Sequence, residues 1–128
     1  MSTERTFSWS MHSEAVGEER LVLRLLDDGT FFFLTGTYSN SWGELEEDST
    51  RYSGTYEDRG GQIICHATQI KRTLRSEDRD WGKKEKSIKR SECEETFVFS
   101  RAEHDEALLV CPEEGFQRRE LRADSSAT

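Results

Sequence analysis

Three histidines and three cysteines are the residues of this sequence that could do metal or nucleophilic chemistry: His12, His66, His104, Cys65, Cys93 and Cys111. Cys65 and His66 are adjacent, and neighbours on a strand point to opposite faces of a sheet, so they are poorly placed to bind one ion. The sequence has no C-x-x-C or H-x-x-x-H spacing, no G-x-S-x-G, no P-loop and no dinucleotide-binding fingerprint. We therefore predict no metal site, no cofactor and no catalytic residue.

The aromatic stretch GTFFFLTGTYSNSW is a better candidate for binding a ligand or a partner. Side chains alternate along a strand, so Phe31 and Phe33 share one face while Phe32 and Leu34 share the other. One face must point inward. The other face needs a cover, which could be the basic segment 74–91, a chain terminus or a partner chain. The inward face either fills a core or lines a pocket.

A pocket in this protein would be mostly apolar with a few polar anchors, as ligand sites usually are. The residues that we predict to line it are Leu23, Leu25, Phe31, Phe33, Tyr52, Tyr56, Ile64, His66, Phe97 and Phe99. Polar candidates that fall inside predicted strands are Arg24, His66 and Gln69. An inward arginine could hold a ligand carboxylate through a bidentate pair, whereas an outward one would be solvated.

The elements that would position these residues are short strands separated by turns. Predicted strands are Arg5–Met11, Arg20–Leu26, Thr30–Tyr38, Arg51–Glu57, Gln62–Thr73, Glu94–Arg101, Ala107–Cys111 and Phe116–Arg122. Asp27–Gly29 and Asp58–Gly61 have the composition of tight hairpin turns. We expect a loop at Asn40–Thr50, and neither face of Gln62–Thr73 is clearly the core face.

These strands predict a single all-β domain over residues 1–128, with 123–128 a loose tail. About eight antiparallel strands in meander order favour an up-and-down β-barrel, because closure removes exposed sheet edges. A two-sheet sandwich is the alternative. The interior of a barrel of this size can be filled by side chains or can hold one small ligand.

The charge of the chain is unevenly distributed. The formal net charge is −8, yet residues 71–90 contain nine basic and four acidic side chains. Net acidity argues against a nucleic-acid partner, while the basic segment leaves an acidic partner open. We expect 74–91 to form a basic loop excursion or an extended hairpin tip.

Cysteine content and the N-terminal sequence predict a cytoplasmic location. An odd number of cysteines without a disulfide-framework spacing is typical of reduced thiols. The N-terminus MSTERTFSWS lacks the apolar segment of a secretory signal, and the longest apolar run is too short to span a bilayer.

Residues 20–70 contain the segments LRLLDDGTF, GTY and YSGTYEDRGGQII. Their strand–turn sequence pattern resembles that of the calycin-like barrels, which include the lipocalins. The resemblance implies a barrel with a cavity for an apolar or amphipathic small molecule. Our leading functional hypothesis is therefore a non-enzymatic small-molecule-binding protein. The alternative is a protein-interaction module with a filled barrel, which would bind a protein partner or a second copy through the outer face of 30–38 and the basic segment.

Overall fold

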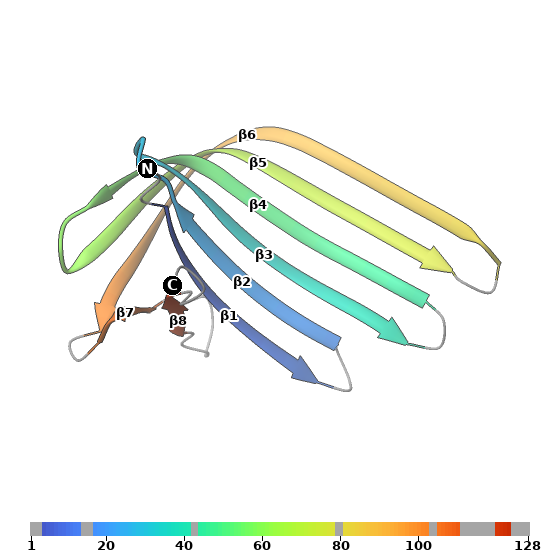
Figure 1. Ribbon diagram of the computed structural model, residues 1–128. Coiled ribbons are helices and arrows are strands. Elements are labelled where there is room, and N and C mark those ends of the chain that lie inside the picture. The colour runs from blue at the N-terminus through green and yellow to red at the C-terminus, as the bar shows by residue number, and fades with distance from the viewer. Residues whose placement is uncertain are drawn as a thin grey trace.

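The computed structural model is all-β and antiparallel, which confirms that part of the predicted fold class (Figure 1). The structure describes residues 4–13, 17–41, 44–78, 81–102, 105–110 and 120–123. The strands are β1 (Arg5–Ser13), β2 (Gly17–Leu25), β3 (Thr30–Ser41), β4 (Glu44–Asp58), β5 (Gln62–Asp78), β6 (Lys83–Ala102), β7 (Asp105–Val110) and β8 (Glu120–Ala123). Each strand pairs with the next one along the chain, and β8 also pairs with β1 at Phe7↔Ala123 and Ser8↔Arg122.

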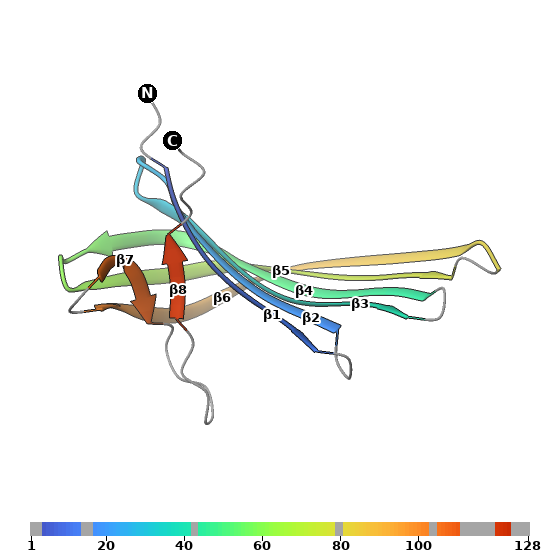
Figure 2. The same ribbon diagram turned by 60° about the horizontal axis from the view of Figure 1, so that its bottom comes forward.

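The sheet has a curled end and a flat end. At the curled end β6 bends toward β7 and β8, which lie beneath the arch of the long strands (Figure 1). Away from that end β1 to β6 run out side by side as a thin layer, and the β5–β6 hairpin projects furthest (Figure 2). Within the described residues, β6 from Lys83 to Phe99 pairs with β5 alone, since β7 pairs only with Ser100–Ala102. In the described part of the chain, no strand pairs with the other edge of this part of β6.

The core lies on the inner face of the curled end, under the arch. Its buried side chains are Phe7, Leu21, Leu23, Leu25, Phe31, Phe33, Ile63, Cys65, Ala67, Phe99 and Leu121. The directly opposed pairs Leu23↔Phe33 and Leu25↔Phe31 show why they share a face, because opposed residues of an antiparallel pair point the same way. Alternation in β2 and β3 therefore has the predicted period of two.

The two predicted tight turns are confirmed. Gly29 has φ +87°, and the Asp28 carboxylate accepts hydrogen bonds from the amide of Thr30 at 3.0 Å and from its hydroxyl at 2.5 Å. Those bonds, chiefly the hydroxyl one, lower the pKa of Asp28. At the second turn Gly60 has φ +81° and donates its amide hydrogen to Asp58 at 2.9 Å. Glycine suits both turns because positive φ costs it nothing.

The predicted loop at Asn40–Thr50 is wrong, and so is the loop alternative for 74–91. Most of Asn40–Thr50 lies in β3 and β4, and most of the basic segment 74–91 lies in paired strands of a long hairpin with its turn at Trp81–Gly82. Neither segment shows apolar alternation. Their strands continue a register anchored in the core, supported by cross-strand ion pairs such as Arg72–Asp48 at 3.1 Å and Lys84–Glu77 at 3.6 Å. The alternative expectation, an extended hairpin tip, describes 74–91 correctly.

Candidate functional site

The predicted lining residues of the interior are mostly inward, and they contact one another. Leu23, Leu25, Phe31, Phe33 and Phe99 are buried. Tyr52, Tyr56 and Phe97 are half-buried and pack against the same core. The Phe33 ring lies 5.3 Å from that of Phe97 and 5.2 Å from that of Phe99, and the Tyr52 and Phe97 centroids are 4.8 Å apart. Edge-to-face rings at these separations are a packed arrangement, so this part of the interior is occupied by side chains.

Two of the predicted lining residues, Ile64 and His66, and the polar candidate Arg24 lie on the outer face instead. Arg24 is exposed and pairs with Glu4, so it cannot anchor a ligand in the interior. On β5 the buried side chains are Ile63, Cys65 and Ala67, which leaves Ile64 and His66 pointing outward. Pairing with β4 decides this face, since Asp58↔Ile63 and Tyr56↔Cys65 are directly opposed. Gln69, the third polar candidate, is also exposed.

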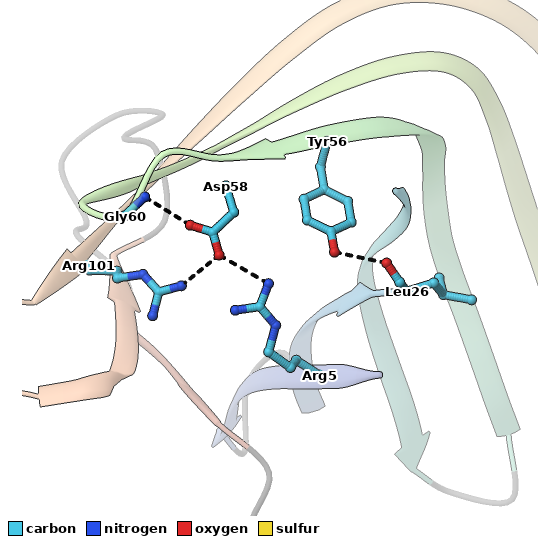
Figure 3. A network of polar contacts seen from close by, with 6 residues as sticks. All are labelled: Arg5, Leu26, Tyr56, Asp58, Gly60 and Arg101. Carbon is cyan, nitrogen blue, oxygen red and sulfur yellow. Dashed lines mark hydrogen bonds and ion pairs between the residues drawn. The ribbon is translucent and has the colours of Figure 1, made fainter. Parts of the chain in front are cut away.

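A polar network ties three strands together at the curled end (Figure 3). The Asp58 carboxylate on β4 accepts hydrogen bonds from Arg5 of β1 at 3.2 Å and from Arg101 of β6 at 3.0 Å. Burial alone would raise the pKa of Asp58, but the Gly60 amide and the two guanidinium groups outweigh it and lower the pKa. Nearby, the Tyr56 hydroxyl donates to the Leu26 carbonyl at 2.8 Å. The polar ends of Asp58 and Tyr56 are therefore engaged in holding the fold.

Asp58→Asn is expected to lower the free energy of unfolding at pH 7 by about 1–2 kcal/mol, because both guanidinium groups lose a charged partner. The lowered pKa means that this stabilisation is present above the ordinary carboxyl pKa and is lost as pH falls through the folded-state value. Urea unfolding should therefore separate wild type from the variant at pH 7 and bring them together at strongly acidic pH. A constant difference across this range would contradict the assignment.

The thiols and imidazoles that the structure describes are Cys65, Cys93, His12 and His66. Cys65 is buried, and burial raises its pKa to about 12, so it is a poor nucleophile near neutrality. Among the described residues, no group of three His, Cys, Asp or Glu side chains could hold a metal ion. His12 and His66 are exposed, while His104 and Cys111 lie outside the described residues.

In the part of the chain that the structure describes, no helix could cross a membrane.

The outer face of β3 carries the second aromatic surface. Phe32 and Leu34 are half-buried there. The Arg51 guanidinium lies over the Phe32 ring at 5.0 Å, and Arg20 lies over the Tyr38 ring at 5.3 Å. Arginine side chains from neighbouring strands thus cover part of this face. This shields its aromatic rings from water, although the basic segment does not fold over them.

A row of three cations crosses the outer face of β4, β5 and β6, and we call it the cationic row. Arg51 is directly opposite Lys71, and Lys71 is directly opposite Arg90. The Arg51 guanidinium lowers the pKa of Lys71 most, followed by burial, Arg90 and Lys86. These residues are about 20 positions apart in the sequence, so only the strand register reveals that they are neighbours.

A shallow hollow of about 270 Å³ lies at this row. It is lined by Arg51, Ser53, Gln69, Ile70, Lys71, Arg90, Ser91 and Glu92. Within the described residues, none of the three cations of the row forms an ion pair with a carboxylate, whereas Arg20, Arg59 and Arg72 each do. The hollow therefore concentrates positive charge beside a single carboxylate, that of Glu92.

The distal hairpin, residues 71–91, is exposed along most of its length. Among the described side chains, the large apolar residues with high exposure are Met11, Leu74, Trp81 and Ile88, at 45%, 40%, 80% and 39%. Three of these lie on the distal hairpin. Leu74 and Ile88 lie on opposite faces of the hairpin, because Leu74 is opposite Ser87 while Ile88 is opposite Thr73, and Trp81 lies at the turn between the strands.

Compared with family models, curated proteins and solved structures, the chain has no significant match.

Proposed function

We propose that this protein is a cytoplasmic, non-enzymatic interaction module that binds an acidic, extended segment of a partner protein along the distal hairpin. The observation that carries the proposal is the exposure of Leu74, Trp81 and Ile88 on a hairpin that is otherwise strongly basic. Trp81 is 80% exposed at the turn of a projecting element, and tryptophan is one of the residues enriched at binding hot spots.

The open edge of β6 suggests how the partner is held. Between Lys83 and Phe99 the described pairing uses only the β5 side, so the other edge can take an added strand. Lysines on an edge commonly guard against pairing with other chains. Here Lys83, Lys84, Lys86 and Lys89 would at the same time favour a strand that carries carboxylates.

The interior favours this proposal over the small-molecule hypothesis. The contacts among Phe33, Tyr52, Phe97 and Phe99 use the apolar surface that a ligand would need. We include in the proposal that the sheet closes into a filled barrel at its curled end, which the pairing of Phe7 with Ala123 supports. The calycin-like relationship and a pocket remain predictions from the sequence.

The test uses a ten-residue peptide of alternating Glu and Val, with an alternating Lys and Val peptide as its charge control. We expect the acidic peptide to change Trp81 fluorescence and to slow amide hydrogen exchange along β6 at 83–94. The double variant Lys86→Glu/Lys89→Glu should weaken binding at least about tenfold, since it reverses two contact charges. Arg59→Glu, at the turn of the opposite end, should change the affinity by less than about threefold.

Four outcomes would overturn the proposal. The first is equal binding of both peptides, and the second is exchange protection that appears away from β6. The third and fourth come from native mass spectrometry of the untreated protein. A retained apolar small molecule would favour the pocket hypothesis, and a stable dimer would make a second copy the occupant of the hairpin.

A further inference from the structure

We infer that the hollow at the cationic row is a binding site for a phosphoryl group, carried on a phosphoserine or phosphothreonine of the partner segment. The inference rests on the proposed function for the identity of the partner and on the geometry of Arg51, Lys71 and Arg90 for the chemistry.

The row itself is the first argument. Adjacent strands lie about 4.8 Å apart, so three directly opposed cations form a line about 10 Å long on one face. Like charges placed directly opposite one another destabilise a sheet. The repulsion at Lys71 is visible in its lowered pKa. An arrangement that costs stability and has one lining carboxylate, that of Glu92, for three cations fits a site whose remaining counter-charge comes from outside.

The donors around the row fit phosphate. Two guanidinium groups can each present a planar pair of N–H donors to phosphate oxygens, and the Lys71 ammonium between them adds a compact charge. Ser53 and Gln69 supply neutral donors in the same lining. A volume of about 270 Å³ holds a phosphoryl group and several waters, since one water occupies about 30 Å³.

Charge favours a dianion over a single carboxylate. Glu92 lies in the lining and offsets one of the three positive charges, which leaves about two to be neutralised. A phosphorylated side chain carries about −1.5 to −2 near neutrality, whereas a glutamate carries −1. Arg90 also lies on the distal hairpin, so a segment held along β6 would pass beside the hollow.

The experiment compares the Glu–Val peptide with the same peptide carrying one phosphoserine, and adds inorganic phosphate as a separate ligand. We expect the phosphopeptide to bind at least about tenfold more tightly than the unmodified peptide. Lys71→Gln and Arg90→Gln should each remove most of that gain. Arg75→Gln is the matched control, because it removes one positive charge from the same face of β5 outside the hollow.

A stability measurement separates a binding role from a structural one. Because Lys71 lies directly opposite a cation on each neighbouring strand, Lys71→Gln should leave the Tm unchanged or raise it while it weakens phosphopeptide binding. A residue kept for structure would lower both. A lower Tm for this variant, or equal losses of affinity for Lys71→Gln and Arg75→Gln, would overturn the inference.

The same comparison of peptides also distinguishes a failure of this inference from a failure of the proposed function. If the unmodified peptide protects β6 and the phosphoserine adds nothing, the phosphoryl site is wrong and the hairpin function stands. If the phosphopeptide depends on Lys71 but leaves the β6 amides unprotected, the site stands and the hairpin function is wrong. Inorganic phosphate binding with no gain for the phosphopeptide would assign the hollow to a free anion, and tighter binding of single-stranded RNA would assign it to nucleic acid.

Discussion

The Gly54→Ala variant is expected to lose about 3–4 kcal/mol of unfolding free energy, an unusually large effect for one methyl group. Gly54 lies on β4 where the register shifts, opposite the irregularity between Ala67 and Gln69 of β5. A Cβ atom at this position would overlap the carbonyl oxygen of His66 and lie 3.1 Å from the Cα of Ala67. The obstacle is backbone, so it cannot be relieved by a change of rotamer.

Urea unfolding at neutral pH measures this effect, with Gly61→Ala as its control. Gly61 lies in the turn after β4 and has no atom within 4 Å of the added methyl group, so its variant should fall within about 0.5 kcal/mol of wild type. Similar midpoints for the two variants would mean that β4 and β5 do not approach each other closely at the bulge.

Phe33→Ala is the second change with a large expected effect, a loss of about 3–5 kcal/mol. Phe33 is 3% exposed, and its ring contacts those of Tyr52, Phe97 and Phe99. Removing it deletes the common member of these aromatic pairs and leaves a cavity that the surrounding strands cannot fill.

The neighbouring residue provides a sharp comparison. Phe32 points to the outer face, where it is half-buried and contacts the Arg51 guanidinium. We expect Phe32→Ala to cost about 1 kcal/mol or less, because a partly exposed cation–π contact contributes little. Denaturant midpoints of the two variants measure the difference. Equal costs would mean that the two faces of β3 are buried alike, which would undermine both the packed interior and the open outer face.

Short stretches of sequence were enough to predict the part of the fold formed by β2, β3 and the turn between them. Asp28 and Gly29 specify a tight turn through their own hydrogen bonding and backbone freedom, and Leu23, Leu25, Phe31 and Phe33 alternate with a period of two. Both signals act over a few residues, so they can be read without knowing what lies across the sheet.

The face of β5 could not be read in this way. Ile63 and Ile64 are both apolar, and the strand shows no one-sided alternation that would choose between them. The choice is made by pairing with β4, which directs Ile63, Cys65 and Ala67 inward and places Ile64 and His66 outside. A shift of one residue in register would reverse every one of these side chains, and that register depends on contacts distant in the sequence.

By itself, the sequence determined an all-β antiparallel chain, its two glycine turns and its aromatic core. The tertiary structure decided where the basic residues lie and which of them meet. The distal hairpin forms without apolar alternation because its strands extend a register that starts in the core. Arg51, Lys71 and Arg90 become neighbours only through that register, because it aligns positions about 20 residues apart on three successive strands.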